Sequence, residues 1–222
     1  MHRLIVTSNT YRQQSVATDE SLSLDPSGKL LSRMPLKRLE AEVLRDTLLF
    51  VAGRLDDTPY GPADNVDRRP DGLVTSRSTQ RGWRRSIYVL QRRTRIPTLL
   101  ENFDYPQMGP NCIQRGESLV APQALHLMNN QMVYQLAEHF AKRVRTEVGD
   151  EPSTQVQRVY VRAFSRRPTP DETAVAVNAL ETFKKQWMQH NTDGNHDTVP
   201  AQKALVTWCH AVMNLAEFQY VD

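Results

Sequence analysis

Apolar residues recur every three to four positions through most of the second half of the chain. This period constrains the fold more than any other feature, because it places apolar side chains on one face of an α-helix. Within the first of these stretches, Leu125, Leu136 and Phe140 follow the helical spacing. The pattern predicts four helices, at 122–144, 153–164, 169–189 and from about 200 onward.

The clearest helix start is the run Thr169-Pro170-Asp171-Glu172. The Thr169 hydroxyl can accept from the third amide of a helix, while Glu172 can reach back to the Thr169 N–H. Pro170 suits the first helical position, where its missing N–H costs nothing. The negative charge of Asp171 interacts favourably with the positive end of the helix dipole. This run predicts a capping box at the start of the third helix.

The first half of the chain carries a weaker helical pattern. We expect a short helix from His2 to about Gln13 and a longer one from Pro35 to Leu55, with Gly53 as an end signal. The longer helix shows one apolar face, widened by three further residues. The face is formed by Leu36, Leu39, Val43 and Phe50, and the widening residues are Leu44, Leu48 and Val51.

A small β element is predicted near the centre of the chain. Ser86–Gln91 has the length and the β-branched and aromatic content of a strand, and Leu73–Thr75 is a possible partner. Residues Thr58–Gly82 show no periodicity and contain several Pro and Gly, which indicates a long loop. The predicted fold is therefore mainly α, an irregular helical domain with a small central β element and long loops. A helical subdomain over 122–222 is possible.

Composition places the chain among ordinary globular proteins, with 39% hydrophobic and 24% charged residues. No stretch approaches the ~20 apolar residues that span a bilayer, so no transmembrane segment is predicted. The first residues, Met1 to Thr7, are too polar for a signal peptide. The net charge is +3. Because the arginines alternate with acidic residues along most of the chain, specific nucleic-acid binding is not expected.

The sequence contains no catalytic signature. It lacks the nucleophile elbow, the phosphate-binding glycine loops and the zinc-binding His-Glu-x-x-His motif. Of its six histidines, His126 and His139 share a predicted helix but lie thirteen residues apart. No metal site, no cofactor and, on balance, no enzymatic activity are therefore expected. Cys112 and Cys209 either form one disulfide or remain two separate buried thiols, the alternative that we favour.

The early helix also carries charge. Its acidic residues Glu40, Glu42 and Asp46 lie beside Arg38 and Arg45. They form either a carboxylate cluster for acid–base chemistry or metal binding, or a set of ion pairs on a helix surface. We favour the ion pairs, because charges at such spacing commonly pair.

Arginines bracket the predicted strand on both sides. Guanidinium groups bind carboxylate, sulfate or phosphate in a bidentate manner, and aromatic rings can add a stacking surface. The alternative is that these charges protect strand ends or pair with Glu101 and Asp104. The candidate anion-binding residues are Arg84, Arg85, Arg92, Arg93, Trp83 and Tyr88.

Several runs, taken in order, resemble one known family. They are HRLIVTSNTYRQ, RLEAEVLRDTLL, RRSIYVLQRR with PTLLENFDYP, APQALHLMNN, FSRRPTPDE and WCHAVMNLAEFQYVD. They resemble the planctomycete C-terminal domain of unknown function that accompanies planctomycete-type cytochrome c domains. The resemblance implies that residues 1–222 are the N-terminally truncated C-terminal part of one such domain. It also implies an exported parent protein in the periplasm or cell envelope, with upstream cytochrome c or carbohydrate-binding domains. No activity is established for the domain, so no catalytic residue is carried over.

Three functions are compatible with these observations. The first is a non-catalytic interaction or scaffold domain of a larger envelope protein. The second is a module that binds or acts on anionic, sulfated or carboxylated, polysaccharide through the arginine candidates. The third is a docking partner of a c-type cytochrome domain.

Overall fold

A computed structural model describes residues 1–106, 112, 115–190 and 198–221, without the side chains of His190 and Thr198. This part of the chain is mainly α-helical with a few short strands, which confirms the predicted fold class. The chain divides into two compact units, Met1–Leu39 with Gln219–Asp222, and Glu40–Phe218. The helical subdomain over 122–222 stays a prediction.

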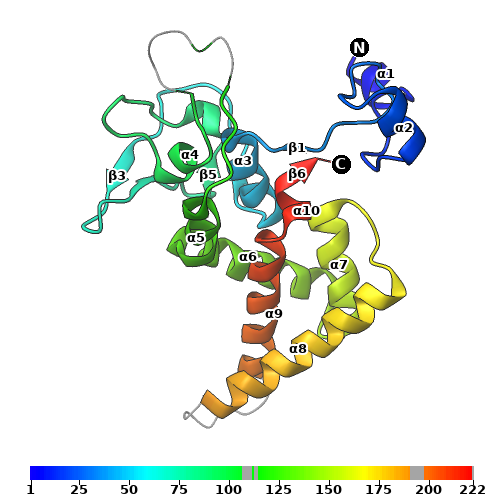
Figure 1. Cartoon of the computed structure of the whole chain (residues 1–222). Helices are drawn as coiled ribbons and strands as arrows, with labels where there is room; N and C mark the ends of the chain where they lie inside the picture. The colour runs from blue at the N-terminus through cyan, green and yellow to red at the C-terminus, as the bar shows by residue number, and fades with distance from the viewer. Residues whose placement is uncertain (107–111, 113–114, 191–197, 222) are drawn as a thin grey trace. The chain divides into compact units, whose positions relative to one another are not determined.

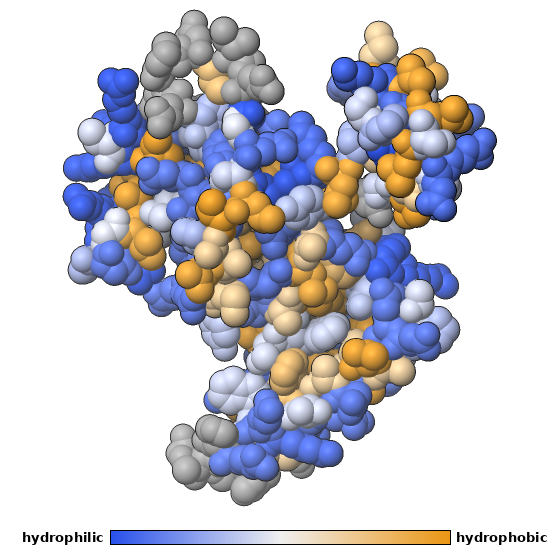
Figure 2. All heavy atoms as spheres, viewed as in Figure 1, coloured by the Kyte–Doolittle hydropathy of each residue, from blue (hydrophilic) through white to orange (hydrophobic). Residues whose placement is uncertain are grey.

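The smaller unit contains little buried surface. Its elements are α1 (His2–Val6), α2 (Asp19–Leu24) and the antiparallel pair β1 (Lys37–Arg38) and β6 (Tyr220–Val221). Neither helix buries a residue, and Figure 2 shows apolar side chains on the surface of this unit. The helix predicted to reach Gln13 ends at Val6, so that prediction was wrong. The hydroxyls of Thr7 and Ser8 donate to carbonyls of the preceding turn, and no apolar contact stabilises a longer helix.

The larger unit contains the hydrophobic core. The helices from Glu40 onward are α3 (Ala41–Val51), α4 (Thr98–Asn102), α5 (Ala121–Asn129), α6 (Gln131–Val148), α7 (Pro152–Phe164), α8 (Pro170–His190), α9 (Thr198–Met213) and α10 (Ala216–Gln219). Helix α9 crosses α6 and lies beside α8 (Figure 1), and the Trp187 indole of α8 donates to the Thr207 hydroxyl of α9 at 3.2 Å. Leu136 and Phe140 of α6 are buried.

The predicted helix at 122–144 is in fact two helices, because Asn130 interrupts it. The Asn130 backbone is extended, and its side-chain oxygen accepts from the amides of Met132 at 2.8 Å and Val133 at 3.4 Å. Asparagine is among the strongest helix-capping residues, so it both ends α5 and starts α6. His126 and His139 therefore lie on different helices, which corrects the prediction that they share one.

The capping box at the start of α8 is confirmed. The amide of Glu172 donates to the Thr169 hydroxyl at 3.2 Å, and the Glu172 carboxylate accepts from the Thr169 amide at 2.7 Å. Helix α7 begins one residue before its predicted start at 153. Glu151 caps it by accepting from the backbone amides of Ser153 and Thr154. A carboxylate at this position is also stabilised by the positive end of the helix dipole.

In α3 the predicted apolar face was wrong. Leu36 lies outside the helix, and Val43 and Phe50 are exposed, whereas Leu44 and Leu48 are completely buried. Apolar residues cover more than half of this helix surface, so the period alone does not select the buried side. The packing of α3 on α4 and α6 selects the side of Leu44.

The β structure differs from the prediction. Ser86–Gln91 is not a strand, because Ser86–Tyr88 forms a 3₁₀ turn, η1. The Ser86 amide at the start of this turn donates to the Asp46 carboxylate. Instead of one aperiodic loop, this region contains two strand pairings of two or three residues and one isolated bridge. Parallel strands are β2 (Leu55–Asp56) and β5 (Trp83–Arg84), and antiparallel strands are β3 (Val66–Arg68) and β4 (Val74–Ser76), while an isolated bridge joins Asp64 and Val89.

The cap at Asn130 generates a stability prediction. Asn130→Ala removes both bonds to the first turn of α6, and we expect the free energy of unfolding to fall by about 1–2 kcal/mol. Asn129→Ala is the matched control, because its side chain is exposed and, among the described residues, donates to the Leu125 carbonyl and not to the first turn of α6. Urea unfolding followed by circular dichroism measures both. Equal effects of the two substitutions would contradict the role of the cap.

Candidate functional site

A buried guanidinium joins α3 to the segment at 55–90. The Arg45 side chain is 3% exposed and donates to the Arg84 carbonyl at 3.0 Å, the Ser86 hydroxyl at 3.2 Å and the Ser76 hydroxyl at 2.8 Å. Burial lowers the pKa of Arg45 to about 10, although the neighbouring Asp46 carboxylate raises it. Arg45 therefore remains charged at neutral pH. Its N–H groups donate to a carbonyl and two hydroxyls from a different segment of the chain.

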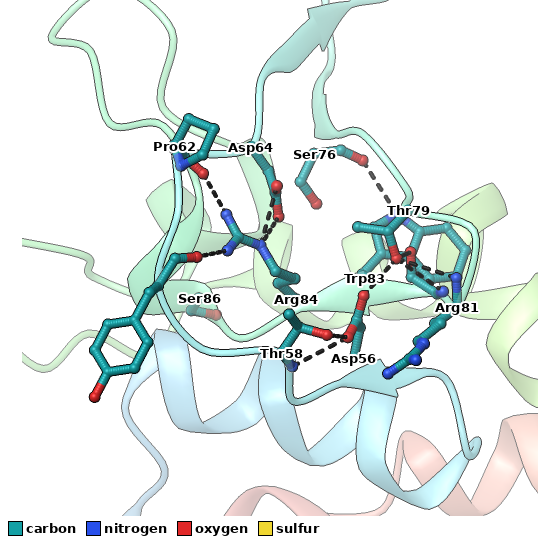
Figure 3. A network of polar contacts seen from close by, with 12 residues as sticks. Asp56, Thr58, Pro62, Asp64, Ser76, Thr79, Arg81, Trp83, Arg84 and Ser86 are labelled. Atoms are coloured by element: carbon teal, nitrogen blue, oxygen red, sulfur yellow. Dashed lines mark hydrogen bonds and ion pairs between the residues drawn. The ribbon is translucent and has the colours of Figure 1, made fainter.

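A second guanidinium, that of Arg84, is saturated by its neighbours. Its Nε donates to both oxygens of Asp64 at 3.0 and 3.1 Å, and its terminal nitrogens donate to the carbonyls of Tyr60 and Pro62 (Figure 3). The guanidinium also stacks 4.5 Å from the centre of the Tyr88 ring. The Asp64 hydrogen bonds raise the pKa of Arg84. Arg84 therefore has little capacity left for a ligand.

Asp56 organises the other side of this network. Its carboxylate accepts from the Thr58 hydroxyl at 2.6 Å and the Thr79 hydroxyl at 2.7 Å (Figure 3), and these bonds lower its pKa to about 2. The nearby Gly82 has φ +147°, and a Cβ there would lie 2.0 Å from the Arg54 carbonyl oxygen. Only glycine fits at this position, because the backbone just before β5 lies so close to the backbone that follows α3.

An open groove of about 880 Å³ runs along α3 and η1 beside the network. Three apolar side chains lie along it, with Val43 45%, Phe50 56% and Ile87 81% exposed. Asp57 and Arg85 add charge to the same groove. The groove thus combines an apolar strip with a charged rim, all built on the buried arginine network.

The acidic residues of α3 form ion pairs, as favoured from the sequence. The Glu42 carboxylate accepts hydrogen bonds from both terminal nitrogens of Arg115, at 2.7 and 2.8 Å. The Asp46 carboxylate accepts a further bond from the Ser86 hydroxyl at 2.7 Å. Burial raises the pKa of Glu42, but the Arg115 bonds outweigh it and leave this pKa below the ordinary value. Glu42 therefore pairs with a residue of a distant segment, whereas Asp46 pairs with its helix neighbour Arg45 at 3.4 Å and with Arg85 at 3.5 Å.

The six candidate anion-binding residues do not form one surface. Arg84 is buried, Tyr88 lies against Arg84, and the half-buried Trp83 donates its indole N–H to the Ser76 carbonyl at 3.1 Å. The other three are exposed. They are Arg85, whose Nε lies 3.5 Å from Asp46, and Arg92 and Arg93 in the segment after η1.

The histidines whose contacts are described occupy separate positions. Asn130 donates its amide N–H to Nε2 of buried His126 at 3.0 Å, so this nitrogen is the acceptor of a neutral imidazole, and burial lowers its pKa. His210 bonds the Leu127 carbonyl at 3.0 Å, and His196 lies outside the described residues. Among the residues with described positions, no three His, Cys, Asp or Glu side chains converge to hold a metal.

The cysteines are not joined by a disulfide. Cys209 is completely buried in α9, which raises the pKa of its thiol, while Cys112 is exposed. The expectation of two separate thiols is confirmed, but the expectation that both are buried was wrong for Cys112. Its neighbours Asn111 and Ile113 lie outside the described residues.

The sequence analysis missed the network around Arg45. One local signal was present, because Arg45 lies on the same helical face as Ala41, Leu48 and Leu49, all of which are buried. When an arginine within an apolar face is buried, its guanidinium must be paired or hydrogen-bonded. No local signal identified the bond from Arg84 to Asp64, 20 residues apart, or the bond from Thr79 to Asp56, 23 residues apart.

Comparison with known proteins gives one match. The family model PSD1, a protein of unknown function (DUF1553), matches residues 1–180. The chain belongs to the DUF1553 family. No curated protein and no solved structure matches it. The arginine network and the groove lie within the part of the chain that matches the DUF1553 model, whereas α9 lies beyond it. None of the described helices is both long and apolar enough to span a bilayer.

The network around Arg45 generates a second stability prediction. Arg45→Met keeps the apolar stem but leaves the hydroxyls of Ser76 and Ser86 and the Arg84 carbonyl without their donor. We expect a loss of about 3 kcal/mol in the free energy of unfolding. Arg85→Met is the control, because Arg85 approaches the same Asp46 from an exposed position, and we expect less than about 1 kcal/mol. Chemical denaturation measures both variants. A loss below about 1 kcal/mol for Arg45→Met would refute the role of this guanidinium.

Proposed function

We propose that this DUF1553 chain is a non-catalytic interaction domain of a larger envelope protein. The observation that carries the proposal is the groove along α3, where Val43, Phe50 and Ile87 are exposed in one strip. Exposed apolar strips with a polar rim are typical of protein–protein contacts. Apolar side chains also gather at several other places on the face drawn in Figure 2.

The charged groups around the groove support binding over catalysis. Asp46 accepts bonds from Ser86 and Arg45, and Glu42 is held by Arg115, whose hydrogen bonds leave the pKa of Glu42 below its ordinary value. A general acid or base requires a pKa near the working pH, and the Arg115 bonds move the pKa of Glu42 away from it. The groove is thus rigid and charged, which suits recognition of another protein surface.

The partner that we propose is another domain of the same envelope protein, a c-type cytochrome domain. This partner is suggested by the resemblance to planctomycete domains that accompany cytochrome c, which also suggests the periplasm or cell envelope as the location. The groove supplies the contact chemistry. Ile87, the most exposed of the three apolar side chains, stands on a 3₁₀ turn fixed to Asp46, so it is a preorganised anchor.

Titration of the haem domain with this chain tests the proposal. We expect binding to release heat, and Ile87→Asp to weaken it at least about tenfold, because the variant places a charge in the apolar centre of the contact. Val175→Asp is the matched control, since Val175 is 68% exposed on α8, away from the groove. Isothermal titration calorimetry and the haem absorption spectrum measure the binding. Absence of both signals with the unmodified chain rejects the cytochrome partner.

A second candidate is binding of an anionic polysaccharide. It is favoured by Arg92 and Arg93, two neighbouring exposed arginines for which the described part of the structure shows no ion pair. Their guanidinium groups suit sulfate or carboxylate groups of a polymer.

Retention on a sulfated-glycan column tests this alternative. The double variant Arg92→Ala/Arg93→Ala should elute at clearly lower salt than the unmodified chain, because fewer cations contact the polymer. The control Arg3→Ala/Arg12→Ala removes the same charge from exposed positions elsewhere. If both double variants elute at the same salt concentration, retention reflects net charge only and the alternative is rejected.

A further inference from the structure

A separate pocket of about 270 Å³ lies among α7, α8, α9 and the turn that follows α6. Its floor is apolar and firmly packed, with Leu180 7%, Ala204 2% and Leu205 2% exposed. The volume lies just below the roughly 300–1,000 Å³ of pockets for drug-sized ligands. The pocket therefore fits a compact molecule with an apolar body, and it shares no residue with the groove along α3.

One side of the rim is an ion pair that is already complete. Arg145 at the end of α6 holds both oxygens of Asp150, with its Nη2 at 3.2 Å from Oδ2. Gln155 of α7 fixes the same turn by donating to the Gly149 carbonyl at 2.7 Å. This side of the pocket is therefore a neutral wall, held in place before any ligand arrives.

Another part of the rim carries two opposite charges. Glu181 and Lys184 lie three residues apart on α8 and both line the pocket. The described part of the structure shows no ion pair for either of them, unlike Arg145 and Asp150 on the same rim. A cation and an anion thus stand side by side above an apolar floor.

We propose that this pocket binds a small zwitterion with an apolar side chain, of the free α-amino acid class. The ligand carboxylate would pair with Lys184, its ammonium with Glu181, and its side chain would lie on Leu180 and Leu205. A simple carboxylate would leave Glu181 unpaired beside it, and a simple amine would do the same to Lys184. Only a ligand with both charges matches the whole rim.

Calorimetric titration of the intact chain with leucine tests the proposal. A ligand of this size is expected to bind with a Kd on the order of 1 mM. Two analogues serve as probes of the rim: 4-methylpentanoate lacks the ammonium group, and isoamylamine lacks the carboxylate. Both should bind about tenfold more weakly than leucine, since each leaves one rim charge unpaired.

Variants then assign the contacts. Lys184→Gln and Glu181→Gln should each weaken leucine binding about tenfold, while Lys185→Gln, a neighbouring exposed lysine outside the pocket, should leave it unchanged. Both pocket substitutions are on the accessible rim of α8, and a thermal melt confirms that each variant folds. Absence of leucine binding, equal binding of either analogue, or equal effects of Lys184→Gln and Lys185→Gln would each overturn the proposal.

Discussion

The Arg45 guanidinium holds together parts of the chain that hydrophobic packing alone does not join. From a buried position on α3 it donates to groups at residues 76, 84 and 86, which are 31 to 41 positions away in the sequence. The segment it binds contains few buried apolar residues and only two- or three-residue strands. Since a buried charge is tolerated only when its N–H groups are bonded, this segment must adopt the conformation that supplies the acceptors.

The other polar contacts extend this arrangement outward. The Arg84 carbonyl accepts a hydrogen bond from Arg45, and the Arg84 side chain donates to Asp64. Arg84 thus joins the buried centre to the surface loops. Asp46, next to Arg45, fixes η1 through the Ser86 amide. The groove along α3 therefore has walls made by a hydrogen-bonded network and a lining of apolar side chains. This construction gives a rigid surface, which suits the recognition role that we propose.

The helical part of the larger unit is held together mainly by apolar packing and not by buried hydrogen bonds. There α6, α8 and α9 pack through continuous apolar faces, and charged residues stay at the surface in pairs such as Arg166 with Glu172 and Glu217. The pocket lined by Glu181 and Lys184 lies in this part of the chain. The two candidate sites thus arise in distinct ways, one from exposed apolar residues above a polar network and one from two opposite charges above an apolar floor.

The sequence by itself determined the fold class, the extent of α8 and its capping box, because these depend on residues within a few positions of one another. It also indicated ion pairing of Glu42 and Asp46, though not that Arg115 is the partner of Glu42. Tertiary structure alone decided which face of α3 is buried, that Ser86–Tyr88 forms a turn, and that Arg84 is internal while Arg85 is exposed. Adjacent arginines have the same local preferences, so only contacts with distant residues such as Asp64 can separate their roles. The position of Asn130 lies between these cases, since its capping chemistry is local but the helical period around it concealed the break.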